Sequence, residues 1–234
     1  MIRKILSVIM LMLVLNSCDM DSIEGRGDLK TETRVLKPFS KINLDIDAHV
    51  IITRDSVQSV RIEAQPNILQ VLTTNISNGE LDISREVRIT DYKMITVYIS
   101  MPNLEGVDVS GSGSIETRGT FSPDKIDLSI SGSGIINVSL SANEAVANII
   151  GSGNINLNGS ARKFNIDIVG SGDVNAQNMP AENCEVSVQG SGNSKVFAIS
   201  KLKVDIQGSG NVYYKGKPDI SNSIAGSGKL EKSN

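Results

Sequence analysis

The sequence predicts an all-β fold, a parallel β-helix in which the chain winds through stacked coils of 18–21 residues. The first observation is the tripeptide Gly-Ser-Gly, which occurs seven times in the second half of the chain at steps of 21, 19, 19, 20, 18 and 18 residues. The copies begin at Gly111, Gly132, Gly151, Gly170, Gly190, Gly208 and Gly226. Fourteen of the 21 glycines lie in these copies, so glycine marks a position in a repeat and does not indicate a flexible linker.

The second observation is the apolar pattern around each tripeptide. Two residues before its first glycine stand Val109, Ile130, Ile149, Ile168, Val188, Ile206 and Ile224, and four residues after it stand Ile115, Ile136, Ile155, Val174, Ser194, Val212 and Leu230. Such columns have even offsets, which is the period of a strand with one buried face, and β-branched residues dominate them. Each repeat is therefore a strand, a glycine corner, a second strand and a return loop, and stacked coils bury their inner faces together.

Both glycines of each copy are expected at the inward phase of a tight corner, where a side chain would crowd the core and φ can be positive. The predicted corner glycines are Gly111, Gly113, Gly132, Gly134, Gly151, Gly153, Gly170, Gly172, Gly190, Gly192, Gly208, Gly210, Gly226 and Gly228. The serine between them points outward, which predicts a ladder of Ser112, Ser133, Ser152, Ser171, Ser191, Ser209 and Ser227. A solvated structural stripe is the simpler interpretation of this ladder, and a hydroxyl row that binds a ligand is the alternative.

Residues 1–17 have the pattern of a bacterial lipoprotein signal peptide. A basic start precedes an apolar run, Ile5 to Leu15, that is too short to span a bilayer. The run ends in Leu15-Asn16-Ser17-Cys18, which resembles the lipobox, where the cysteine is acylated and becomes the new N-terminus. Cys18 is therefore the predicted lipid attachment site, and two acyl chains suffice for stable anchoring. A plain signal peptide with an incidental cysteine is the alternative.

Residues 18–30 are predicted to form a lipidated tether. Asp19, Asp21 and Glu24 give it an acidic start, which resembles the surface-export signal of Bacteroidota lipoproteins. An ordinary solvated tether explains the same residues equally well. We therefore expect a cell-envelope, outer-membrane lipoprotein and leave open whether it faces the cell surface.

Composition and cysteine use restrict the partners. Loss of residues 1–17 removes two basic side chains and leaves 21 basic and 26 acidic ones, a net charge of −5, which argues against a nucleic-acid partner.

With Cys18 acylated, Cys184 has no disulfide partner, and its inward column predicts a buried small hydrophobe. The single histidine, His49, lacks the partners of a catalytic triad or a metal site. We expect no metal and no cofactor.

Residues 31–105 precede the repeats without a change in composition, and we expect them to form irregular N-terminal coils that cap the solenoid within one domain. Strand patterns lie at residues 42–52, 60–62, 81–83 and 95–101, and Asn78-Gly79 is a turn. Pro66 to Thr74 has the pattern of one or two helical turns, with Ile68, Leu69 and Leu72 facing the core. With the regular Gly-Ser-Gly repeats of residues 106–234, the solenoid is expected to have roughly ten coils.

Three stretches carry a resemblance to a known family. They are Phe39-Ser40-Lys41-Ile42, Asn78-Gly79-Glu80-Leu81-Asp82-Ile83, and the run from Val107 to Gly113 with the later repeats. Together they resemble the proteins described as putative auto-transporter adhesin, head GIN domain. The resemblance extends over roughly residues 30–230. It implies a right-handed β-helix on a secreted or lipid-anchored protein, and it implies no catalytic residue.

Few residues indicate catalysis. We assign Asp127, Asp167 and Asp205 to one outward column, with each two coils from the next, a gap of about 10 Å that is wide for a pair of glycosidase carboxylates. A solvated acidic stripe explains them more simply. The Gly-x-Gly elements are followed by strands and not by helices, so they do not predict a dinucleotide site.

The outward columns offer little for carbohydrate binding by aromatic rings, because the chain has no tryptophan. Tyr92, Phe197 and one of the neighbours Tyr213 and Tyr214 are the candidates, too few to predict a sugar platform. A further outward column, Asn154, Asp173, Asn193 and Asn211, predicts a ladder of side chains with capacity for water or a weak cation.

These observations favour a non-enzymatic, lipid-anchored envelope protein that presents a repetitive face for adhesion or assembly. Its expected partners are the membrane, through the N-terminal lipid, and an unidentified protein or glycan. A structural β-helix that self-associates end to end and a glycan-active β-helix enzyme are the alternatives. Lys229, Glu231 and Lys232 place charges on the last coil, which typically prevents edge-to-edge association. A monomer or a small closed oligomer is therefore expected.

Overall fold

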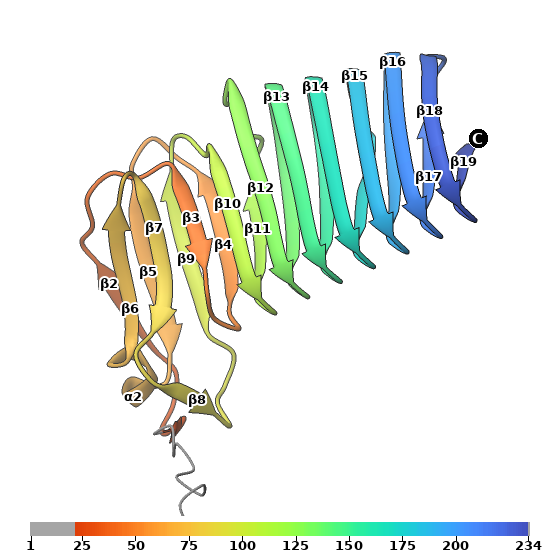
Figure 1. Cartoon of the computed structure of the whole chain (residues 1–234). Helices are drawn as coiled ribbons and strands as arrows, with labels where there is room; N and C mark the ends of the chain where they lie inside the picture. Colours follow the sequence, from red (N-terminus) through yellow and green to blue (C-terminus); the bar gives the residue numbers. More distant parts are fainter. Residues whose placement is uncertain (1–21, 234) are drawn as a thin grey trace, which may run out of the picture.

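The computed structural model describes residues 22–233, so the predicted signal peptide (residues 1–17) and Cys18 lie outside the described part of the chain. Strands account for 71% of the chain, and the sheet forms a β-solenoid of about seven turns with coils of about 19 residues. Figure 1 shows the turns as a row of parallel strands that begins beside the N-terminal strands and ends at the C-terminus. The predicted all-β parallel β-helix is therefore confirmed.

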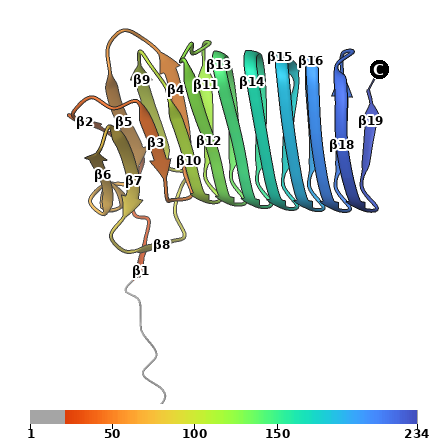
Figure 2. The same ribbon diagram turned by 45° about the horizontal axis from the view of Figure 1, so that its top comes forward.

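Each Gly-Ser-Gly copy gives one turn of the solenoid. The strands of the seven turns are β10 (Gly106–Gly111), β11 (Ser114–Arg118), β12 (Lys125–Gly132), β13 (Ile135–Gly151), β14 (Asn154–Gly170), β15 (Asp173–Gly190), β16 (Asn193–Gly208), β17 (Asn211–Lys215), β18 (Asp219–Gly226) and β19 (Lys229–Lys232). The four long strands, β13 to β16, join the second strand of one turn to the first strand of the next, so strand structure replaces the predicted return loop. Their arrowheads line one edge in Figure 2, where each strand ends on a first glycine.

The turns stack in register, and this register builds the core. The first glycines of successive copies are direct partners from Gly111 to Gly226. Inward columns alternate in size: Ala145, Phe164, Cys184 and Leu202 follow one another as partners, and all four are buried. Small residues beside a large one let neighbouring coils interlock at the density of a protein interior.

The N-terminal strands are not stacked in chain order. β3 (Lys41–Leu44) and β4 (His49–Arg54) pair in parallel with β10 and β11 on one side. On the other side they pair in parallel with the later strands β7 (Glu80–Arg85) and β9 (Thr96–Met101). β3 and β4 come first in the sequence, but they form the second layer of the stack, inside the layer of β7 and β9. Residues 31–105 add two such layers, and the solenoid has about seven turns, fewer than the roughly ten coils expected.

Antiparallel strands close the N-terminal end. β5 (Ser59–Ala64) pairs with β9 and with β2 (Lys30–Arg34), while β6 (Leu72–Ser77) pairs with β7. The predicted helical segment is a single turn, α2 (Pro66–Leu69), because the chain enters β6 at Leu72. β1 (Ser22–Glu24) and β8 (Arg88–Thr90) form a separate two-stranded sheet. Within residues 22–233, no helix is long and apolar enough to span a membrane.

Candidate functional site

The two glycines of each corner serve different purposes. The first has a positive φ, between 104° and 133° over the seven copies, and it is only partly buried or exposed. From Gly132 onward, a Cβ on this first glycine would overlap the carbonyl oxygen of the first glycine in the preceding coil. The second glycine is buried in the copies from Gly113 to Gly210, where a Cβ would overlap inward side chains such as Ile149 beside Gly172. The expectation that both glycines face inward therefore holds for the second only, because positive φ breaks the alternation.

All seven corner serines are exposed, from Ser112 to Ser227. From Ser133 onward, their backbone N–H groups donate to the first glycine of the preceding coil, as Ser171 does to the carbonyl of Gly151 at 2.8 Å. Among the side chains, the hydroxyls of Ser209 and Ser227 lie 3.1 Å apart. The corner edge is thus a solvent-exposed hydroxyl stripe held by the backbone.

The outward aspartates are arranged differently from our assignment. Asp127 pairs with Val146, whereas Asp167 pairs with Asn148 on one side and Ser187 on the other. Ser187 in turn pairs with Asp205, so Asp167 and Asp205 share a column two coils apart. The assignment of Asp127 to the same column is wrong, because Asp127 lies five residues before its glycine while the other two lie three residues before theirs. These three carboxylates therefore form no catalytic pair.

The column of Asp167 does contain a perturbed acid, Asp108, which is half-buried. Burial raises the pKa of the Asp108 carboxyl above its ordinary 3.8, the nearby Glu80 carboxylate raises it further, and a hydrogen bond with Ser110 opposes both. Between the unfolded and the raised folded pKa, the folded state binds more protons, so stability from this group falls as pH rises through that window.

We therefore expect Asp108→Asn to stabilise the protein at pH 7, because burial and the Glu80 carboxylate disfavour the charged form of Asp108 in the folded state. Near pH 3 the carboxyl is protonated in both states, and the advantage of the variant should disappear. Urea denaturation of both proteins at the two pH values measures this. The exposed Asp167→Asn, in the same column, is the control and should shift stability by less than about 0.5 kcal/mol. A gain that is equal at both pH values would contradict the electrostatic cause.

A groove of about 740 Å³ lies on the outer face of the strands that follow the corners, and we call it the amide groove. It is lined by Asn154, Asn156, Asp173, Asn175, Gln177 and Asn193, with Ile135 at one end and Lys195 and Tyr213 at the other. Register partners show that it crosses the strands and runs along the solenoid axis, because Ile135, Asn154, Asp173 and Asn193 occupy successive coils. At about 4.8 Å per coil, the four steps from the coil of Ile135 to that of Tyr213 span about 19 Å.

A β-bulge shapes the middle of the amide groove. Asn156 pairs with Asn175, but the next recorded partners are Asn158 and Asn178, so one extra residue lies in β15. The register between β15 and β16 shifts at the same place. Bulges redirect side chains and interrupt ladders, and here Gln177 lines the groove. The sequence signal is the 20-residue step between Gly170 and Gly190, one residue longer than the step before it.

Two amide ladders run along the groove and stop on either side of the bulge. On one side, the Nδ2 of Asn156 donates to the Oδ1 of Asn137 at 2.8 Å. On the other, the backbone N–H and Nδ2 of Asn193 both donate to the Oδ1 of Asp173, at 2.8 and 3.0 Å. Asn211 continues that second ladder by donating to Asn193. The predicted ladder column is therefore linked from Asp173 to Asn211.

Polar groups remain free where the ladders stop. The Oδ1 of Asn175 is buried and has no hydrogen-bond partner among the described residues. The amide groove also carries one carboxylate, Asp173, and one ammonium group, Lys195, so its charges balance. A surface with many neutral donors and acceptors, balanced charge and one aromatic ring can bind an uncharged polar ligand by hydrogen bonds. It does not provide the two flanking carboxylates that glycoside hydrolysis ordinarily requires.

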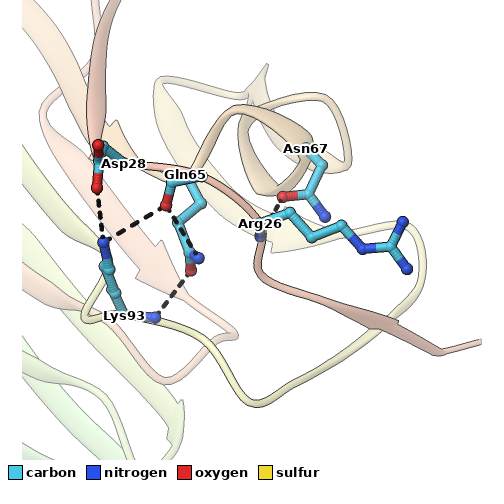
Figure 3. A network of polar contacts seen from close by, with 6 residues as sticks. Arg26, Asp28, Gln65, Asn67 and Lys93 are labelled. Atoms are coloured by element: carbon cyan, nitrogen blue, oxygen red, sulfur yellow. Dashed lines mark hydrogen bonds and ion pairs between the residues drawn. The ribbon is translucent and has the colours of Figure 1, made fainter.

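The segment that precedes the domain is itself held in place, as Figure 3 shows. The backbone N–H of Arg26 donates to Asn67 at 2.8 Å, and Asn67 donates to the carbonyl of Glu24 at 2.7 Å. Gln65, 5% exposed, accepts from the backbone N–H of Lys93 at 2.9 Å. The Lys93 ammonium lies 3.2 Å from Asp28. From Ser22 onward, the predicted tether is thus fixed against the N-terminal strands.

Cys184 and His49 lie in surroundings that indicate a structural role. Cys184 is buried, and burial raises the pKa of its thiol to about 12, so the thiol stays protonated and unreactive at neutral pH. His49 lies 3.8 Å from the Glu116 carboxylate of the neighbouring coil. Among residues 22–233, no group of three His, Cys, Asp or Glu side chains is placed to hold a metal ion.

Several solved structures share this fold. A putative adhesin from Bacteroides fragilis is 24% identical, with a TM-score of 0.86 over 90% of this chain and 100% of the other. From Parabacteroides distasonis, a putative adhesin and a putative lipid binding protein are each 22% identical. Their TM-scores are 0.76 and 0.75, over 91% and 92% of this chain and 100% of theirs. At these identities the likeness shows the fold alone.

Comparison by sequence gives a family. No curated protein matches the chain. The profile of the family described as putative auto-transporter adhesin, head GIN domain, matches residues 38–218, which include β3 to β17 and all the lining residues named above for the amide groove. The match covers well over half of the 234 residues. The chain therefore belongs to the putative auto-transporter adhesin, head GIN domain family.

Proposed function

We propose that this protein is a lipid-anchored protein of the cell envelope that acts as a non-enzymatic, adhesin-like binding module. The observation that carries the proposal is the amide groove, an outward-facing polar surface built on a stiff stack of coils. The family description and the neighbours named as adhesins are consistent with such a role. We expect the protein to act as a monomer or a small closed oligomer.

The groove supports binding rather than catalysis. Asp173, its one carboxylate, already accepts two hydrogen bonds from Asn193. A general acid or nucleophile would need a second carboxyl group across the ligand, and the register puts Asp167 and Asp205 in a different column, two coils apart. We therefore propose that a bound ligand is held and released unchanged.

The fixed N-terminal segment supports presentation close to a membrane. If Cys18 carries the lipid, the four steps from Cys18 to Ser22 reach at most about 14 Å when extended. Ser22 begins β1, which pairs with β8 at the N-terminal end of the solenoid. Under this proposal the antiparallel end faces the membrane and the regular coils extend away from it.

Anchoring can be tested at the predicted attachment site. Replacement Cys18→Ser should abolish labelling with radioactive palmitate and move the protein from the membrane fraction to the soluble fraction, because no acyl chain remains. The matched control is Cys184→Ser, which removes the other cysteine and should leave labelling and partitioning unchanged. Membrane partitioning that survives Cys18→Ser would contradict the anchored form of the proposal.

A further inference from the structure

We infer that the amide groove binds a linear, uncharged glycan laid along the solenoid axis. The inference deepens the proposed binding function, on which it rests, by naming the ligand class and the residues that contact it. Three observations lead to it: the direction of the groove, the break in its ladders, and its balance of charge.

The direction of the groove selects a linear polymer. Its lining comes from successive coils, so equivalent polar groups recur at about 4.8 Å along about 19 Å. A small ligand would occupy one coil only, whereas an extended chain can repeat the same contacts at each coil. Its rim also differs along its length, because Ile135 lies at one end and Tyr213 at the other. An aromatic face at one end suits the apolar face of a sugar ring.

The break in the ladders gives the contacts. On either side of the bulge, side chains pair between coils, as Asn156 does with Asn137 and Asn193 does with Asp173. At the bulge this exchange stops, and the buried Oδ1 of Asn175 is left unpaired. An unpaired buried acceptor is unfavourable, and rotation of the Asn175 amide toward the groove would let a sugar hydroxyl donate to it. The bulge brings Gln177 into the groove near Asn175, and the Gln177 amide offers both a hydrogen-bond donor and an acceptor.

The charge balance excludes other polymers. With one Asp and one Lys, the groove offers no excess of positive charge for a phosphate backbone. A peptide strand binds best by adding to an open sheet edge, but the floor of this groove is the face of strands already paired on both sides. A polyhydroxylated, uncharged chain remains as the class whose groups match those of the groove.

The test is titration of the full-length, detergent-solubilised protein with defined oligosaccharides. The probes are hexamers of β-1,4-glucose, β-1,3-glucose, α-1,4-glucose, β-1,4-mannose and β-1,4-N-acetylglucosamine, and binding is measured by calorimetry and by saturation-transfer NMR. We expect at least one probe to bind and its reducing-end content to stay constant over a day. The matching disaccharide should bind at least tenfold more weakly, since two sugar rings span only about half of the groove.

Variants assign the binding to the groove. Gln177→Ala and Asn154→Ala should each weaken binding at least fivefold, and Tyr213→Ala should do the same. The same substitutions at exposed positions outside the groove, Gln189→Ala and Asn165→Ala, should leave affinity unchanged. Circular dichroism melting of every variant checks that the fold persists.

The outcomes separate this inference from the proposed function. If no probe binds, or if the groove variants bind as the parent does, the glycan inference is overturned. Anchoring through Cys18 would be unaffected by either result. Release of reducing ends would overturn the non-enzymatic function while leaving the glycan class in place. Binding of an extended peptide in competition experiments, without binding of any oligosaccharide, would replace the inference with a protein partner.

Discussion

Gly170→Ala is expected to destabilise the solenoid by about 2–6 kcal/mol, one of the two largest effects of a single substitution that the structure predicts. Gly170 has a φ of 126°, and a side chain in such a conformation costs about 1–3 kcal/mol. Its new Cβ would also overlap the carbonyl oxygen of Gly151 in the preceding coil, and relief of that overlap requires the two coils to separate locally. Overpacking of this kind costs about 1–3 kcal/mol more.

Two control variants separate these contributions. Gly111 has a φ of 104°, but a Cβ there would have no atom within 4 Å, so Gly111→Ala should show only the conformational part, about 1–3 kcal/mol. Ser171→Ala changes the exposed neighbour of Gly170 and should cost less than about 0.5 kcal/mol. Urea denaturation measures all three. Equal losses for Gly170→Ala and Gly111→Ala would show that the contact between corners adds nothing.

Phe164→Ala is expected to cost about 3–5 kcal/mol, because it removes a large side chain from the interior without a neighbour able to fill the space. Phe164 is 1% exposed, and its partners in the adjacent coils are the small residues Ala145 and Cys184. Urea denaturation and amide hydrogen exchange in these three coils measure the loss.

The interlocking of this column predicts a graded response. Phe164→Leu keeps much of the volume and should cost clearly less than Phe164→Ala. Val169→Ala lies in the same strand on the outer face, where Val169 is 41% exposed, and it should cost less than about 0.5 kcal/mol. A loss below about 1 kcal/mol for Phe164→Ala would show that the coils close over the cavity.

The regular turns could be predicted from the sequence because their physics is local and repeated. Ile168, two residues before Gly170, and Val174, four residues after it, indicate which face is buried. The other six copies have an apolar residue at the first of these positions, and five of them have one at the second. The sequence does not reveal one reason why glycine is needed at Gly170, its close contact with Gly151, because that contact depends on how closely two coils approach.

The N-terminal layers could not be predicted in the same way. The place that Gly-Ser-Gly takes in later coils is held in the first layer by Ile46-Asp47-Ala48, as the pairs Val109 with Leu44 and Ser114 with His49 show. Without a repeated corner, nothing in the sequence indicates that β7 and β9 lie outside β3 and β4. Coils that stack in chain order are the simplest expectation, but the strands pair over a long range in the sequence instead.

The amide groove was visible in the sequence only in part. The repeat pattern identifies the outward column that contains Asp173 and Asn193. It does not indicate that Asn175, Lys195 and Tyr213 line the same groove. What joins them is the bulge near Gln177, and a single added residue in one repeat has no recognisable pattern of its own. The few aromatic residues do not predict a sugar-binding surface, and the amides that dominate the groove are predicted mainly as a structural ladder.

The order of the N-terminal layers has a consequence for the folding of a chain that is delivered from its N-terminus, as it is during synthesis. β3 and β4 emerge early, but the strands that cover them on either side follow much later in the chain. Ile42 and Val50, buried in the finished protein, remain without their neighbours until residue 118 has been delivered. Contacts this distant in sequence slow folding, and exposed strands of this kind aggregate. Until those strands arrive, the N-terminal half is therefore the part of the chain most prone to aggregation, whereas each later coil can add directly to the one before it.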